Sequence, residues 1–411
     1  MSADTPLIGL DLGTSGGRAS MSGLDGPQIV VERAASDAPR DAAARIRDLV
    51  GVVQRDWLPG ALRLGAVMAV PAHADFTARA ALLDAARLAG LAPVRLVNAP
   101  TAAALAYARL QGVRGPIAVF AFGAETFDVS VVSIEAGLVE VLAAAGDVDL
   151  GGGGLDRAVA QALEGECSAP PEPGVLLSVA GAARLALGAR FDVPVAVPLV
   201  DGRVENLRLT RDRLEAIAAP VLARVEGPCR EALIEAGLRA KDLAGLVLVG
   251  GGTQPQHVRR HVGRLFGLTP SGTLHPERVV ALGCALHAAR LEAGRDCTAS
   301  DDWLVLDALA APLSVLAADG EPRQLLPRGA RLPASAEVRV EALFESQGRR
   351  ELHVVAASGR RGERGRTLAR WSAEGVRLRC VIDEDGALDV QSVLADGRVQ
   401  PAARIAEGEA R

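Results

Sequence analysis

The sequence is almost without lysine: its 45 basic residues include one lysine, Lys241, and are otherwise arginine. A step that needs a lysine ammonium is therefore confined to that position. The five cysteines are odd in number and contain no Cys-x-x-Cys pair, which argues against a disulfide framework and a zinc site. Aromatic residues make up 3% of the chain, so leucine, valine and alanine must build the core. No apolar stretch approaches the ~18 residues of a membrane span.

Charge and length narrow the class of protein further. The formal net charge of −5 provides no overall basic field for binding nucleic acid or an anionic membrane. A length of 411 residues, 49% of them hydrophobic, predicts two or three globular domains. Residues Met1–Pro6 carry Asp4 and no basic region, so we expect no signal peptide and a cytoplasmic location.

Three apolar segments each run into a glycine-rich turn. They are Leu7–Gly17, Ile117–Asp128 and Leu246–Thr253. The first two share the order strand, glycine, small polar turn, second strand, which predicts an internal duplication with one copy in each of two lobes. Backbone N–H groups of facing turns can form a concavity that binds phosphate oxygens. We therefore expect a phosphate-binding cleft between two lobes.

The order of strands and helices predicts an α/β part followed by an all-β part. Helical patterns, including one helix over residues 211–236, alternate with strands up to about residue 298. Beyond it, a period-2 strand over residues 376–382 and the turn Asp385-Gly386 indicate short antiparallel strands. We predict a domain over residues 1–298, a linker over 299–308 and a small β domain over 309–411.

Short motifs occur in a fixed order along nearly the whole chain. They are Asp11-Leu12-Gly13-Thr14, Val70-Pro71-Ala72, Asn98-Ala99-Pro100-Thr101, Gly123–Asp128, Leu150-Gly151-Gly152, Val249–Thr253, His275-Pro276-Glu277, Leu304-Val305-Leu306-Asp307 and Ile382–Gly386. Together they resemble the DnaK-type 70-kDa heat-shock chaperones. The resemblance implies a two-lobed actin-like ATPase domain followed by a small all-β sandwich that grips extended peptides under the control of the bound nucleotide.

The resemblance also implies a site for ATP or ADP with Mg²⁺. Asp11, Thr126 and Asp128 would be the catalytic positions, with Asp11 and Asp128 as magnesium ligands. The other nucleotide contacts would be Gly13, Thr14, Ser15, Gly16, Gly123, Gly151, Gly152, Arg184, Gly250, Gly251, Gly252 and Thr253. The residues themselves leave two alternatives open: Asp11 as a carboxylate that caps its own turn, and Arg184 as a solvated arginine on a helix face.

The chain departs from the family pattern at groups that hydrolysis needs. Ala99 and Ala121 replace family carboxylates, and the short segment between Gly17 and Val67 lacks the subdomain whose lysine faces the γ-phosphate. Loss of one such contact typically costs ~10²–10³ in rate, so we expect hydrolysis to be very slow or absent. Glu125 replaces a glycine and could repel phosphate, bind magnesium or simply face solvent.

The peptide groove implied by approximate alignment with the family carries two arginines. The groove positions are Ala317, Arg339, Ala342, Arg350 and Leu352. Two arginines there would not suit a hydrophobic guest side chain, so either the groove prefers acidic or polar guests or it is degenerate. The printed sequence ends at Arg411, before the helical lid of the family, so we expect peptide binding to be weak and transient.

The sequence thus predicts a shortened chaperone homologue that binds ATP, with hydrolysis weak or lost. Its expected partners are unfolded or extended peptides and co-chaperones, with no nucleic acid and no membrane, and its expected role is in protein folding and the stress response. A pseudo-ATPase scaffold or interaction module is the alternative, and nucleotide affinity separates the two. An actin-fold small-molecule kinase is a remoter alternative that the β domain and linker argue against.

Overall fold

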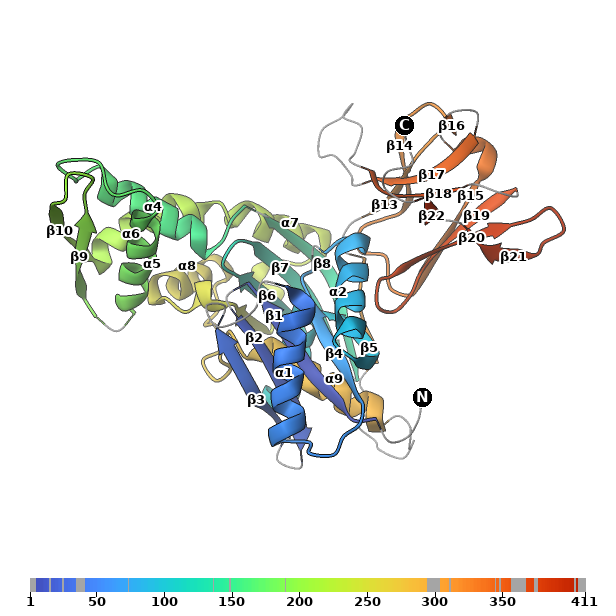
Figure 1. Cartoon of the computed structure of the whole chain (residues 1–411), viewed down its shortest axis with the longest axis horizontal. Helices are drawn as coiled ribbons and strands as arrows, with labels where there is room; N and C mark the ends of the chain where they lie inside the picture. The colour runs from blue at the N-terminus through green and yellow to red at the C-terminus, as the bar shows by residue number, and fades with distance from the viewer. Residues whose placement is uncertain are drawn as a thin grey trace.

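The computed structural model describes most of residues 5–405 (Figure 1). The residues left out within that range are 15, 24–25, 35–40, 73, 136, 148, 189, 294–303, 310–311, 344, 347–348, 356–366, 373–375 and 403. In the described part of the chain, no helix is long and apolar enough to cross a membrane.

The helices and strands alternate in the first three quarters of the chain, and strands alone follow. The helices are α1 (Ala42–Asp56), α2 (Phe76–Leu88), α3 (Ala99–Gln111), α4 (Gly152–Glu164), α5 (Val175–Ala186), α6 (Arg211–Ala223), α7 (Glu226–Glu235), α8 (Gln256–Phe266) and α9 (Val279–Ala293), with 3-10 turns η2 (Ala240–Asp242), η3 (Gly251–Thr253) and η4 (Val340–Ala342). The strands up to α9 are β1 (Leu7–Gly13), β2 (Gly16–Gly23), β3 (Gly26–Ala34), β4 (Leu64–Val70), β5 (Leu91–Asn98), β6 (Gly115–Phe122), β7 (Phe127–Glu135), β8 (Leu138–Asp147), β9 (Asp192–Pro198), β10 (Val204–Thr210) and β11 (Gly245–Val249). The later strands are β12 (Leu304–Leu306), β13 (Leu313–Leu316), β14 (Pro322–Leu326), β15 (Ala334–Arg339), β16 (Glu345–Ser346), β17 (Arg349–Val355), β18 (Thr367–Ser372), β19 (Arg377–Ile382), β20 (Leu388–Val393), β21 (Val399–Pro401) and β22 (Arg404–Ile405).

Two five-stranded sheets of the same design form the two lobes. The first has the order β3-β2-β1-β4-β5 and the second the order β11-β6-β7-β8-β12. In each lobe three consecutive strands form an antiparallel meander, and a later strand, β4 or β11, lies parallel to the first strand of that meander. This repeated arrangement matches the duplication expected from the first two glycine-rich turns.

Both sheets are buried on both faces, so side chains of alternate residues enter different cores. In β1, Leu7 faces the core between the lobes, whereas Ile8 packs against α1 and α2. In β6, Ile117 faces the central core, whereas Ala118 and Phe120 pack against α6, α7 and α8. The near-continuous apolar runs that predicted these strands reflect this double burial.

Helices α3 and α9 cross between the two lobes. The crossing is close at Gly283 of α9, where an added Cβ would lie 1.8 Å from the carbonyl oxygen of Ala102 in α3. A side chain at this position is therefore excluded by the backbone of the other helix. Small residues, most of them alanine, along α3 let it pack in the centre of the molecule.

Most predicted helices are confirmed, and one is wrong. Asp75 caps α2 as expected, because its carboxylate accepts a hydrogen bond of 2.8 Å from the N–H of Ala78. The helix predicted over residues 211–236 is instead two helices, α6 and α7, which are separated at Arg224 and Val225. Pro228 lies in the first turn of α7, where its missing N–H is tolerated. The apolar pattern continues across the break and concealed it.

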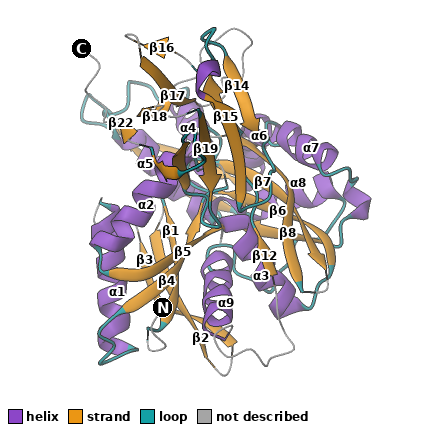
Figure 2. Ribbon diagram, turned by 90° about the vertical axis from the view of Figure 1, so that its right-hand side faces the viewer, coloured by secondary structure: helices purple, strands orange, loops and turns teal. Residues whose placement is uncertain are grey.

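The last quarter of the chain forms a β-sandwich (Figure 1, orange to red). One sheet has the order β14-β13-β17-β18-β22, with β16 beside β17, and the other has the order β15-β19-β20-β21. Figure 2 turns the sandwich toward the viewer, in the upper part of the picture, with the two lobes behind and below it. The predicted turn at Asp385-Gly386 joins β19 to β20, with Gly386 at φ +72°. Strand β12, from the predicted linker, pairs in parallel with the edge strand β8 of the second lobe.

Candidate functional site

The first glycine-rich turn joins β1 to β2 in a tight hairpin. Gly13 pairs with Gly16, so Thr14, which is exposed, stands at the tip. Ser15, also predicted as a nucleotide contact, lies outside the described residues. Asp11 lies opposite Arg18 in the same ladder. Burial raises the pKa of the Asp11 carboxyl from 3.8 to about 6, and the charges of Arg18 and Arg45 partly oppose that rise. A half-buried carboxylate whose ionised form is disfavoured in this way is a candidate for binding a cation.

Two arginines that the sequence analysis did not assign hold this hairpin. Arg45 of α1 donates from Nη2 to the carbonyl oxygens of Gly13, at 2.7 Å, and Gly16, at 3.1 Å. Arg18 is 7% exposed, and its Nε donates to the Oε1 of Glu32 at 2.8 Å. Hairpin register, which places residue 18 opposite residue 11, could have identified Arg18. No local signal in the sequence links Arg45 to the turn.

The second glycine-rich turn joins β6 to β7 and contacts the start of α4. Within the turn, the N–H of Gly123 donates to the carbonyl of Thr126 at 2.9 Å. The N–H of Gly152 donates to Gly123 O at 2.9 Å, and that of Gly153 donates to Ala124 O at 2.6 Å. These two amides at the N-terminus of α4 are therefore occupied and do not point at a free anion site in this arrangement.

The side chains of the second turn differ in their exposure to solvent. Asp128 is half-buried at the start of β7 and lies opposite Ala121 in the ladder. Thr126 is half-buried, whereas Glu125 is exposed to solvent. The exposure of Glu125 agrees with the solvated role, one of the three left open by the sequence.

The third glycine-rich turn packs directly against the second. An added Cβ on Gly252 would lie 2.5 Å from the Phe122 ring and 2.6 Å from the Phe122 carbonyl oxygen. Gly250 has φ +88° and would also place a Cβ 2.6 Å from that oxygen. The hydroxyl of Thr253 donates to the carbonyl of Gly250 at 2.7 Å, so it is used within its own turn. Glycine is therefore required at both positions by packing, whether or not a ligand binds.

Glu277 connects the first turn to the third. One carboxylate oxygen lies 3.4 Å from Arg18 Nη2, and the other accepts a hydrogen bond of 2.7 Å from the side-chain amide of Gln254. The neighbouring Arg278 pairs with Glu32 of β3 at 2.9 Å. The structure therefore brings the first, second and third turns and the start of α4 into one connected group, which we call the turn cluster (Asp11–Gly17, Gly123–Asp128, Gly151–Gly152 and Gly250–Thr253).

The two predicted magnesium ligands, Asp11 and Asp128, are both carboxylates. Among the described residues, no three His, Cys, Asp or Glu side chains group as a metal site. Mg²⁺ often takes one or two protein carboxylates and completes its shell with phosphate oxygens and water. Asp11 and Asp128 are hard oxygen donors, so the residues present fit Mg²⁺ bound together with nucleotide phosphates, where it would neutralise phosphate charge.

Arg184 of α5 is buried beside the start of α4. Its Nε and Nη2 bond the two carboxylate oxygens of Asp156 in α4 at 2.6 and 3.3 Å. Nη2 also lies 3.7 Å from the place of a Cβ on Gly152. Arg184 is 6% exposed, so the alternative of a solvated helix-face arginine is wrong.

Four of the five proposed groove positions gather around Leu343 in the sandwich. Ala317 forms a β-bridge with Leu343, and the carbonyl of Ala342 accepts from Ala318 N at 2.9 Å. Arg339 directly precedes η4. The guanidinium of Arg350 donates to the carbonyl of Leu343 at 2.6 Å and pairs with Glu345 at 3.0 Å.

The fifth groove position lies elsewhere. Leu352 is fully buried in the core between the two sheets of the sandwich. In this arrangement its side chain packs against core residues and does not face an open groove.

A buried aspartate that follows β12 joins three parts of the molecule. The Oδ2 of Asp307 accepts from the N–H of Asn98 at 2.8 Å, and Oδ1 accepts from the hydroxyl of Thr101 at the start of α3. The side-chain amide of Asn98 also donates to Ala308 O at 3.3 Å. Burial raises the pKa of Asp307, against these hydrogen bonds and the charge of Arg79.

A second buried network fixes the sandwich to the first lobe. Arg79 of α2 is 3% exposed and donates to the carbonyl of Asp385, at 3.0 Å, and to the side-chain oxygen of Asn98. The Asp385 carboxylate accepts from the N–H of Leu96 in β5 at 2.7 Å. Ion pairs Arg95–Glu384 and Arg331–Glu140 flank this contact. The sandwich is thus held by hydrogen-bonded groups that solvent does not reach.

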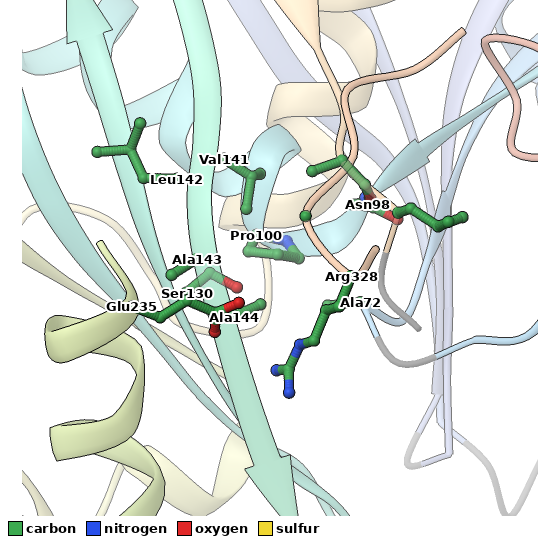
Figure 3. A pocket seen from close by; sticks show the side chains of 13 residues that line it. Ala72, Asn98, Pro100, Ser130, Val141, Leu142, Ala143, Ala144, Glu235 and Arg328 are labelled. Atoms are coloured by element: carbon green, nitrogen blue, oxygen red, sulfur yellow. The ribbon is translucent and has the colours of Figure 1, made fainter. Parts of the chain in front are cut away.

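Figure 3 shows a small cavity at this junction, beside Asn98, Pro100, Ser130 and Arg328. Its volume of about 20 Å³ is close to what a single water needs, so it is a packing defect of the interface and not a ligand site.

The architecture defines a class of protein. Two lobes of the same design, a crossed helix pair between them, clustered glycine-rich turns and a following β-sandwich together make an actin-like ATPase-type domain with a β-sandwich module. Comparison with known families then identifies the family. A family model described as Hsp70 protein matches residues 61–393, and the chain belongs to the Hsp70 family.

Curated relatives support the same assignment. The chain is 37% identical over 383 residues to a protein named "Chaperone protein HscA homolog" from Bordetella petrii. The matched stretch covers 89% of this chain and 61% of the relative. It is 37% identical over 405 residues to the protein of that name from Bordetella pertussis, with coverage of 92% and 64%, and 36% identical over 385 residues to that from Burkholderia pseudomallei. The chain spans less than two thirds of the length of these relatives.

Proposed function

We propose that this chain binds ATP or ADP with Mg²⁺ at the turn cluster. The observation that carries the proposal is the connection of the first and third glycine-rich turns through Glu277, whose charge also acts on Asp11, a carboxylate whose pKa burial raises to about 6. Asp11 and Asp128 would hold the metal, and the hydroxyls of Thr14 in the first turn and Thr126 in the second turn would meet phosphate oxygens. Magnesium, when bound, would neutralise phosphate charge.

Hydrolysis in this proposal is very slow or absent. The methyl groups of Ala99 and Ala121 cannot orient water or bind a cation. Arg18 is neutralised by Glu32 and Glu277, and Arg45 is engaged by two carbonyl oxygens, so neither arginine is free to replace the missing lysine. Transition-state charge would lack several stabilising groups that act together.

Nucleotide binding would act on the β-sandwich through the contacts at Asp307 and Asp385. The Asp385 carboxylate accepts from Leu96 of β5, and the Asp307 carboxylate accepts from Asn98 at the end of β5 and from Thr101 of α3. A movement of the first lobe would therefore change these contacts. By analogy with the family, we propose extended peptides and co-chaperones as partners. Arg350 already pairs with Glu345, which supports weak peptide binding at the proposed groove.

A scaffold without nucleotide remains the second candidate. It is favoured by one observation: the amides of Gly152 and Gly153 donate to the second turn and leave fewer donors for phosphate. In that case the docked sandwich and lobes would serve as a binding platform.

Calorimetric titration with Mg·ATP and Mg·ADP separates the two candidates. We expect saturable binding of one nucleotide per chain, abolished by Asp11→Ala, whose structural cost is checked by far-UV circular dichroism. Absence of binding at millimolar nucleotide to folded protein would leave the scaffold as the function.

A further inference from the structure

Helix α8 presents a basic face at the surface of the second lobe. Its opposite face, with Val258, Val262 and Phe266, is buried in the core that also holds the phenylalanines of β6 and β7. The basic face follows the spacing i, i+3, i+4, i+7, i+8, i+11, which places residues on one side of a helix. It consists of Gln256, Arg259, Arg260, Gly263, Arg264 and, directly after the helix, Gly267.

The loop that follows α8 turns this face into a groove. Gly267 ends the helix with φ +65°, and the chain then returns along it, so that Arg259 Nη2 donates to the carbonyl oxygen of Ser271 at 3.1 Å. The approach is close at Gly263, where an added Cβ would lie 3.0 Å from the carbonyl oxygen of Leu268. A groove of about 860 Å³ lies along the helix face and the loop residues Leu268, Thr269, Pro270 and Gly272.

The charge of the groove is positive. Its described lining holds three guanidinium groups and no carboxylate. Arg260 is paired with Glu215 of α6, whereas Arg259 and Arg264 make no ion pair within the described residues. Burial lowers the pKa of both histidines of α8, so they add no charge at pH 7. The groove is therefore a local positive site on a chain whose formal net charge is −5.

The shape and the other lining residues favour a peptide over a nucleic acid. The face from Gln256 to Gly267 is ~17 Å long, which is the length of about five residues of an extended chain. Leu268 and Pro270 are half-buried and offer an apolar wall. No aromatic side chain on which a base could stack is among the described lining residues.

We propose that this groove binds an extended acidic segment of a partner protein, in which carboxylates meet Arg259 and Arg264 and an apolar side chain between them packs on Leu268 and Pro270. Guanidinium groups bind carboxylates with two parallel hydrogen bonds, which suits such a segment. Neither Arg184 nor a residue of the turn cluster is among the described lining, so the groove stands or falls separately from nucleotide binding.

The test is fluorescence anisotropy of the whole, nucleotide-free chain with a fluorescein-labelled heptapeptide in which glutamate and leucine alternate. We expect saturable binding that weakens as salt is added, because exposed charges are screened. The matched heptapeptide with glutamine in place of glutamate should bind roughly tenfold or more weakly, since its contacts with the arginines are no longer charge-assisted on both sides.

Two variants test the place of binding. Arg264→Glu should weaken binding of the acidic peptide by roughly three- to tenfold, because an attractive contact becomes a repulsive one. Thr269→Glu should weaken it by roughly two- to fivefold, since it brings a carboxylate to the loop wall and leaves every arginine in place. Both residues are exposed, and far-UV circular dichroism checks that the variants fold.

Two further variants serve as controls and should bind the acidic peptide as the unmodified chain does. Arg47→Glu makes the same change of charge at an exposed arginine of α1 in the first lobe, which has no ion pair among the described residues. Arg350→Gln removes an arginine from the groove predicted in the sandwich and so detects binding there.

Four results would overturn the proposal. They are absence of binding by the acidic peptide, unchanged binding in Arg264→Glu or Thr269→Glu, a loss in either control that equals the loss in Arg264→Glu, and tighter binding of a labelled oligouridine than of the acidic peptide. The last result would make the groove a surface for nucleic acid.

Discussion

Replacing Asp11 with asparagine should stabilise the fold at neutral pH, even though it removes a group that we assign to the site. Burial raises the pKa of Asp11 from 3.8 to about 6 in the folded chain. Because the pKa of Asp11 is higher in the folded state than in the unfolded state, the folded state binds the proton more tightly. The stabilisation that this proton binding provides is complete below about pH 4 and is lost as pH rises through about 6. At 1.36 kcal/mol per pH unit, the loss at pH 7 is at most ~3 kcal/mol.

The assay is urea unfolding of the unmodified chain and Asp11→Asn at pH 4, 5, 6 and 7. The free energy of unfolding of the variant should exceed that of the unmodified chain by ~1–3 kcal/mol at pH 7, and the two should converge near pH 4. Asp201→Asn is the control, because Asp201 is exposed and its pKa is lowered by its hydrogen bond to Arg203. A variant that is less stable at pH 7, or a difference that does not change with pH, would refute the reasoning.

Further predictions concern the helix crossing, the sandwich and hydrolysis. Gly283→Val should destabilise the fold by ~3 kcal/mol or more, since its side chain would overlap the carbonyl oxygen of Ala102, and urea unfolding measures this. Arg79→Ala should release the sandwich from the first lobe, and small-angle X-ray scattering should then report a larger radius of gyration; an unchanged radius would count against the network. Because burial raises the pKa values of Asp307 and Asp385 above the ordinary 3.8, docking should weaken as pH rises above ~4, which scattering over a pH series from acidic to neutral can check. Single-turnover ATP cleavage should be far slower than that of ordinary Hsp70 chaperones, and a comparable rate would show that the missing groups have been replaced.

Features of the fold that depend on local pattern were predictable from the sequence. The apolar strands before the glycine-rich turns are β1, β6 and β11, and the Asp75 cap and the turn at Gly386 also occur as expected. Each follows from residues within a few positions of one another. The break between α6 and α7 was not predictable from period alone, because the apolar stripe runs on through it.

Each glycine-rich turn of the candidate site could be predicted from the sequence, but the contacts that join the turns could not. The sequence indicated which glycines end each strand, since that is a local property. It gave no sign that Glu277 would connect Arg18 to Gln254, or that Arg45 would hold the first hairpin from a helix more than twenty residues away. Such contacts depend on how the lobes pack. The hydrogen bond from the N–H of Asn98 to the Asp307 carboxylate depends on packing in the same way.

The most direct test of the central claim is thermal unfolding of the chain with and without Mg·ATP. If the nucleotide binds at the turn cluster, a concentration 100 times the dissociation constant should add ~2.7 kcal/mol to the free energy of unfolding. The melting temperature should rise by several degrees in the unmodified chain and not in Asp11→Ala. A melting curve that is unaffected by millimolar Mg·ATP, or one that shifts equally in both proteins, would contradict the account.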